Sequence, residues 1–133
     1  MPNIRDLIAK QKSFYNSIVS VQCNMLNDIV YFRSEGFHHL VNKSPLKRRK
    51  VSEQCLKLMC LTPAPEIVKD CTKIIETRNE ERTIKGKKKN VITYELIDGK
   101  KRKHNIAVIV ERIGAGKIKF RSVKRISKNR YTE

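Results

Sequence analysis

Apolar and polar residues alternate along four segments in the second half of the chain. The segments are residues 71–78, 90–98, 104–113 and 117–126. A period of two places successive side chains on opposite faces, which is typical of β-strands that bury one face. Turns between them are marked by glycine and lysine clusters at residues 85–90, 98–103 and 114–116. The pattern therefore predicts an antiparallel meander in the C-terminal half.

The first half of the chain shows helical spacing around two short strands. An amphipathic helix is expected over residues 1–17, with one apolar face made by Ile4, Leu7, Ile8 and Phe14. Strands are expected at residues 17–23 and 28–33, and helices at residues 34–41 and 52–61. Ser34 is the expected N-cap of the helix at 34–41, and Pro65 starts a further helical turn.

Helices therefore come first and the strand meander comes last. This order predicts an α+β fold, with N-terminal helices packed on one face of a four- to five-stranded, mainly antiparallel sheet. A chain of 133 residues with 39% hydrophobic composition is expected to form a single domain over residues 1–133 with its own core. Its expected parts are an N-terminal helix at 1–17, a core at 18–126 and a basic tail at 127–133.

Features that would place the chain in a membrane or an oxidising compartment are missing from the sequence. No apolar run reaches the roughly 18 residues needed to cross a bilayer, and the first residues lack the pattern of a secretory signal. We therefore expect a cytoplasmic protein. The cysteines lack the paired spacing of a zinc site, so buried free thiols are expected at Cys23, Cys55, Cys60 and Cys71. No metal or small-molecule cofactor is expected.

Charge changes the picture most. The chain has 30 Lys and Arg against 13 Asp and Glu, a formal net charge of +17. Residues 80–133 alone hold 17 basic and six acidic side chains, and residues 46–50 add four more basic ones. A protein this basic is expected to bind a polyanion, and the phosphate backbone of RNA or DNA is the commonest. A solubilising surface or a basic tail is the alternative.

Two residues stand out on the last strands. Arg112 ends an apolar row in the segment 104–113, and Ser122 interrupts the apolar row of 117–126. The opposite face of this last segment is basic, with Lys117, Lys119, Arg121 and Arg125. Burying a polar group without a partner costs about 1–3 kcal/mol, so Arg112 and Ser122 either bond to backbone or contact a ligand.

The helix at residues 34–41 carries two adjacent histidines. Phe37, Leu40 and Val41 form its buried stripe, so His39 projects away from the core and His38 lies on the flank. The loop that follows carries four basic residues, Lys43, Lys47, Arg48 and Arg49. Imidazole can exchange protons near neutral pH, so His39 is either a reactive group beside a polyanion or an ordinary surface histidine.

Two motifs together resemble a known family. The G-F-x-H-L pattern within residues 30–41, a basic proline-containing loop and the segment VIVERIGAGKIKFRSVKRI are similar to small phage and bacterial nuclease-like proteins of the barnase–EndoU–colicin–RelE-like (BECR) superfold. The match covers about residues 20–126. The resemblance implies an antiparallel sheet with N-terminal helices, metal-independent endoribonuclease activity, often as a toxin, and RNA as substrate.

The resemblance also assigns residues. It places catalytic roles on His39, Arg112, Lys119 and Ser122; lysine stands at 119 where the pattern also has histidine, and His104 could supply a second imidazole. The expected RNA contacts are His38, Lys43, Lys47, Arg48, Arg49, Tyr94, His104, Arg121 and Lys124. Tyr94 could equally be a packing residue. An acidic antitoxin or immunity protein would suit the net charge.

The ribose 2′-OH would attack the neighbouring phosphate, with His39 as base or acid and Arg112 and Lys119 stabilising charge. A non-catalytic RNA- or DNA-binding basic module is the alternative, because it needs the same basic strands but not His39.

Overall fold

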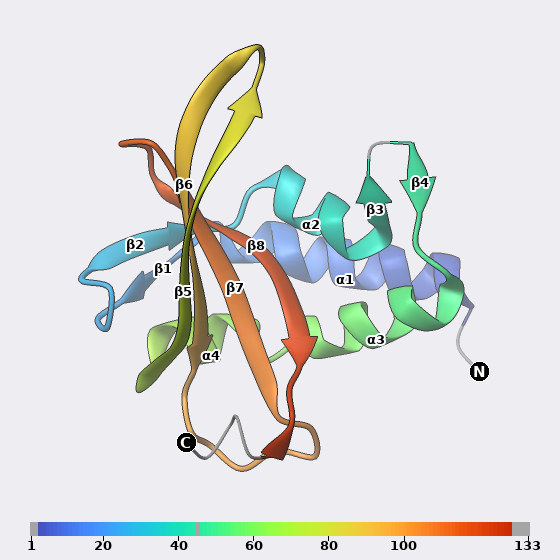
Figure 1. The fold of residues 1–133 in the computed structure, drawn as a ribbon. Coiled ribbons are helices and arrows are strands. Elements are labelled where there is room, and N and C mark those ends of the chain that lie inside the picture. Colours follow the sequence, from blue (N-terminus) through green and yellow to red (C-terminus); the bar gives the residue numbers. More distant parts are fainter. Residues whose placement is uncertain (1–2, 45, 129–133) are drawn as a thin grey trace.

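The computed structural model describes residues 3–44 and 46–128. Helices pack against one face of a twisted sheet, which gives the expected α+β fold (Figure 1). The helices are α1 (Ile4–Ile18), α2 (Ser34–Val41), α3 (Val51–Leu61) and α4 (Ala64–Lys69). The strands are β1 (Ser20–Cys23), β2 (Asp28–Tyr31), β3 (Asn42–Ser44), β4 (Lys47–Arg48), β5 (Lys73–Ile84), β6 (Lys87–Ile97), β7 (Ile106–Ile113) and β8 (Ile118–Arg125).

The main sheet has six strands within the described residues, in the order β1-β2-β8-β7-β6-β5, rather than the expected four to five. The four C-terminal strands form the expected antiparallel meander. The additional strands β1 and β2 join through a parallel pairing of β2 with β8, at Val30↔Ile118 and Tyr31↔Lys119. This pairing covers only the start of β8, so the rest of that strand is an edge.

The core lies between the sheet and the helices. Tyr15 of α1 is 1% exposed and contacts the rings of Phe32, Phe37 and Phe120. Its hydroxyl donates to the carbonyl of Arg33 at 2.5 Å. The N-terminal helix is therefore part of the core. The other fully buried core side chains include Leu40, Leu58, Leu61, Ile67, Val30, Leu96, Val108 and Val110.

Helix α2 packs closely on β8 because residue 36 is glycine. A Cβ atom at Gly36 would lie 2.5 Å from Tyr15 Oη and 2.6 Å from the carbonyl oxygen of Phe120. Both distances are shorter than any normal contact, so a side chain here would push the helix away from the strand. The expected N-cap is wrong: Ser34 is the first helical residue, and Arg33 holds the cap position without a side-chain hydrogen bond.

A bulge in β8 changes which basic residues share a face. Ile109 pairs with Ser122 and Val110 with Phe120, so Arg121 is the extra residue. Beyond such a bulge the alternation shifts by one. Lys124 therefore pairs with Ala107 on the face of Lys119, whereas Arg125 pairs with Ile106 on the helix-covered face. The expected grouping of Arg125 with Lys119 is wrong for this reason.

Strands β5 and β6 extend beyond the sheet as a two-stranded arm, seen at the top of Figure 1. Strand β7 pairs with β6 only from Val91 onward, while the β5–β6 ladder continues to Ile84↔Lys87. A two-residue turn closes the arm, with positive φ at Lys85 (51°) and Gly86 (78°), the backbone that tight hairpins need. We call residues 81–90 the β5–β6 arm.

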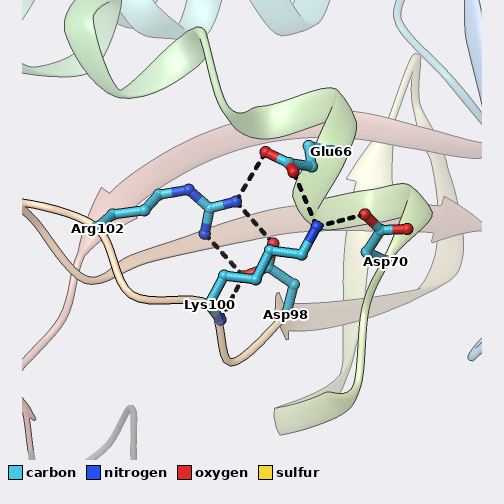
Figure 2. Close-up of polar contacts among 5 residues, drawn as sticks. All are labelled: Glu66, Asp70, Asp98, Lys100 and Arg102. Carbon is cyan, nitrogen blue, oxygen red and sulfur yellow. Dashed lines mark hydrogen bonds and ion pairs between the residues drawn. The ribbon is translucent and has the colours of Figure 1, made fainter.

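The loop between β6 and β7 is held against α4 by a group of charged residues (Figure 2). Lys100 Nζ lies 2.8 Å from Glu66 on α4 and 2.6 Å from Asp70, the C-cap residue of that helix. Arg102 reaches Glu66 at 3.1 Å and donates two hydrogen bonds of 2.7 Å to Asp98. The Asp98 side chain is fully buried, so the pair anchors the loop.

The remaining expectations had mixed outcomes. Cys23 and Cys60 are buried, whereas Cys55 and Cys71 are partly exposed, and all four are free thiols. Lys128 is the last described residue, so most of the expected basic tail lies outside the described residues. No helix of the described residues is both long and apolar enough to span a bilayer.

Candidate functional site

His39 lines a narrow cleft of about 10 Å³ where α2 meets the edge of the sheet. The cleft, called here the His39 cleft, is lined by Arg33, Glu35, Gly36, His39, Glu111, Lys119 and Phe120. Helix α2 brings His39 there because Gly36 lets the helix pack closely on Phe120. The His39 carbonyl at the end of α2 also accepts a 2.9 Å hydrogen bond from Arg49 Nε, which fixes the helix end. The structure therefore confirms that His39 points away from the core stripe, and it brings Lys119 to the same cleft.

The imidazole of His39 is half-buried in a cationic environment. Burial lowers the pKa of His39, and the nearby charge of Arg121 lowers it further. The carboxylates of Glu111 and Glu35 oppose this shift but do not cancel it. A lowered pKa keeps the ring neutral near pH 7, which is the form that accepts a proton.

Glu111 is a functional candidate that the sequence reasoning missed. It lies on β7 directly beside Lys119 of β8, and its side chain is 11% exposed. Its carboxylate accepts hydrogen bonds from Arg121 Nη1 at 2.6 Å and from Arg82 Nη1 at 3.0 Å. Burial alone would raise the pKa of Glu111, but the two guanidiniums outweigh burial and lower it. A single acidic residue within the apolar run VIVERI was the available signal.

The sheet face that no helix covers is hollowed beside Glu111. A hollow of about 270 Å³ on this face, called here the open-face groove, borders Glu111's partners Arg82 and Arg121. Its lining residues are Glu76, Arg78, Glu80, Arg82, Thr93, Glu95, Ile109, Arg121 and Lys124. Lys124 forms an ion pair with the buried Glu95 at 2.5 Å. Basic and acidic side chains thus alternate across this groove.

A further hollow adjoins His39 beside α2 and β3. It is lined largely by apolar atoms, has a volume of about 370 Å³, and borders Glu35, His38, His39, Asn42 and Ser44. The Asn42 amide lies 3.1 Å from His38 Nδ1. A flat apolar hollow with polar groups at its rim has the chemistry that an unstacked nucleobase requires.

Tyr31 places an aromatic ring on the strand beside Lys119, and the sequence reasoning did not select it. It pairs with Lys119 across the parallel β2–β8 contact. Lys117 Nζ lies 4.6 Å from the centre of the Tyr31 ring, and the guanidinium of Arg33 lies 5.3 Å from it. A ring held between cations is a surface on which both a base and its phosphate can be bound.

Two expected catalytic residues lie elsewhere. Arg112 pairs in register with the buried Ile118, so its side chain points to the helix-covered face, where it forms an ion pair with Asp28. Neither Arg112 nor Ser122 lines the His39 cleft. Ser122 is 7% exposed, accepts a hydrogen bond from Lys57 Nζ at 3.2 Å and donates to the Val123 carbonyl at 3.3 Å. The structure therefore does not bring these two together with His39.

The expected RNA contacts divide into four groups. On the open face lie Arg121 and Lys124. On and after α2, His38, Lys47 and Arg48 are exposed.

Three more of the expected contacts, besides Arg121 and Lys124, have structural partners. Lys43 pairs with Glu53 at 3.6 Å, and Arg49 pairs with the same carboxylate at 3.4 Å. Tyr94 pairs with Val110, so it faces the helices and packs against the core. His104 lies in the loop between β6 and β7, at the opposite end of the sheet from the β5–β6 arm (Figure 1).

Comparison with protein-family models, with curated proteins and with solved structures found no significant match to this chain. The resemblance to the BECR superfold therefore rests on the two short motifs and stays a prediction. Any function has to be argued from the site itself.

Proposed function

We propose that the protein is a metal-independent endoribonuclease whose reaction takes place at the mouth of the His39 cleft. One observation carries the proposal: a half-buried imidazole with a lowered pKa lines the same cleft as an ionised carboxylate and a lysine. Titratable groups with shifted pKa values in one cleft are typical of acid–base catalysis. RNA is a suitable substrate for such a site because its own 2′-OH is the nucleophile. The protein then needs only to move protons and stabilise charge.

The neutral imidazole of His39 would act as the base. It takes the proton of the 2′-OH while that oxygen attacks the adjacent phosphorus. The bond from phosphorus to the 5′-oxygen then breaks, which leaves a 2′,3′-cyclic phosphate. The departing 5′-oxygen receives its proton from water or from the ammonium group of Lys119.

The charged residues around His39 have complementary roles in this reaction. Lys119 and Arg121 stabilise the negative charge that builds up on the phosphate oxygens. Glu111 stabilises the imidazolium that His39 becomes, and it holds the guanidiniums of Arg121 and Arg82 in place. This set replaces Arg112 and Ser122, which do not line the cleft.

Cleavage of RNA in EDTA tests the proposal. We expect wild-type protein to produce 2′,3′-cyclic phosphate ends, and His39→Ala and Glu111→Gln to lose cleavage by a factor of about 10²–10⁴, the usual contribution of acid–base catalysis. His104→Ala is the matched control, because it removes a histidine from the far end of the sheet.

Measuring RNA binding separately from cleavage distinguishes a nuclease from a protein that only binds RNA. Affinity for a 2′-O-methyl RNA, which lacks the nucleophile, should be nearly the same in His39→Ala and wild type. Binding by wild-type protein without any cleavage would reject the nuclease and leave the RNA- or DNA-binding module. Equal cleavage by His39→Ala and wild type would reject the assigned site.

A further inference from the structure

We propose that the β5–β6 arm is a second RNA-binding element, which grips the phosphates of the strand that leaves the His39 cleft through Lys87 and Lys89. The identity of the polyanion as RNA rests on the proposed function. The arm itself, its charge and its direction come from the fold.

The arm is basic and exposed. Residues 81–90 contain five basic side chains and one acidic side chain, Glu81, a net charge of +4. Residues 85–90, which include the turn, are all exposed, and the strands here have no third strand beside them. Lysines held this close repel one another, so a polyanion that neutralises them is favoured. The arm carries little apolar surface, which argues against a membrane as the partner.

The two faces of the arm differ. Arg82 pairs with Lys89 and Ile84 with Lys87, so these side chains share one face of the ribbon. Arg82 on this face also reaches Glu111 at 3.0 Å, so the face continues into the open-face groove. Lys88 points to the opposite face, where it pairs with Glu81 at 3.9 Å.

The distances suit a strand running outward from the cleft. From Val91, where the pairing with β7 ends, to Lys87 the arm extends about 13 Å at roughly 3.3 Å per residue. One strand of a nucleic acid carries about one phosphate per 3.4 Å of helix axis, so the arm covers roughly four phosphates. Arg82 pairs with Glu80 and Glu111 and lies between the arm's lysines and the open-face groove, so the lysine-bearing face of the arm leads into the groove.

Two uncleavable 2′-O-methyl RNAs, of about four and about sixteen nucleotides, test the arm by fluorescence anisotropy over a range of salt concentrations. Only the longer RNA can occupy both cleft and arm. Each lost phosphate contact lowers the slope of log K against log salt by about 0.7. Lys87→Ala/Lys89→Ala should therefore lower the slope for the long RNA by about 1.4, which is roughly 25-fold in affinity at 0.1 M salt.

Two controls are matched in charge. The variants Lys88→Ala and Lys89→Ala each remove one lysine, from opposite faces of the same ribbon. Only Lys89→Ala should lower the affinity for the long RNA, by about fivefold. Lys101→Ala/Lys103→Ala removes two exposed charges from the loop between β6 and β7, at the other end of the sheet (Figure 1). This control should retain nearly full affinity for the long RNA.

The proposal is overturned if Lys87→Ala/Lys89→Ala binds the long RNA as the remote control does. It is also overturned if Lys88→Ala is as damaging as Lys89→Ala, or if wild-type protein gains no affinity with RNA length. Because these RNAs lack the nucleophile, the result does not depend on catalysis. A loss confined to Lys87 and Lys89, in a protein that cuts no ordinary RNA, supports the arm and rejects only the nuclease.

Discussion

Replacing Gly36 by alanine tests whether close packing of α2 on β8 positions the cleft. The new methyl group would lie 2.5 Å from Tyr15 Oη, 2.6 Å from the Phe120 carbonyl oxygen and 2.8 Å from the Phe120 ring. The carbonyl belongs to the paired strand β8 and cannot move without disturbing the sheet, so the helix has to shift.

Two effects of opposite sign decide the stability. Alanine favours a helix over glycine by about 1 kcal/mol. Overpacking a filled core costs about 1–3 kcal/mol, and backbone contacts this short belong at the upper end. We therefore expect Gly36→Ala to lower the free energy of unfolding by about 1–2 kcal/mol. For a chain of this size that lowers Tm by roughly 3–10 °C.

The effect on cleavage should be larger than the effect on stability. A misplacement of about 1 Å at a reacting group can lower the rate by about 100-fold. Thermal unfolding followed by circular dichroism and cleavage measured well below Tm separate the two effects. Ser34→Ala, at an exposed position of the same helix, is the control. A Tm equal to or above that of wild type in Gly36→Ala would show that helix propensity wins and that the packing argument is wrong.

Three further changes have defined outcomes. Burial and Arg121 lower the pKa of His39 below about 6.5, the ordinary pKa of histidine. As the pH is lowered, kcat/KM should therefore stay high past about 6.5 and fall only when the ring is protonated. A fall of kcat/KM that begins above about pH 6.5 would contradict the role of His39 as base. Asp98→Asn breaks the ion pair between the buried Asp98 and the mostly buried Arg102, and should lower the free energy of unfolding in urea titrations by about 2–3 kcal/mol. Glu66→Gln, at the exposed end of the same group of charges, should change the free energy of unfolding little. Tyr15→Phe removes the hydrogen bond to the Arg33 carbonyl and should cost about 1–2 kcal/mol by thermal unfolding; no change would mean that the bond contributes nothing net.

The elements with clear periodicity were predictable. The helices at α2 and α3 and the four strands of the meander follow from spacing that one short window contains. His39 was correctly placed away from the core because Phe37, Leu40 and Val41 define the buried stripe of their own helix.

What depended on pairing between distant segments was not predictable. The contact of β2 with β8 joins residues far apart in the sequence, and it raises the strand number to six within the described residues. The bulge at Arg121 changes which face of the sheet the following side chains point to, and no local sequence pattern indicated it. Glu111 looked like one polar residue in an apolar strand until Arg82 and Arg121, from two other strands, were brought to it.

The parallel contact between β2 and β8 has a consequence for how the chain folds. Strand β2 pairs with a strand that begins at Ile118, so the sheet cannot be completed until β8 has left the ribosome. Contacts of such large sequence separation slow folding, because a long loop has to close first. We therefore expect the meander to form early, and the N-terminal hairpin and α2 to join it last. The His39 cleft would then be assembled only in the final step of folding.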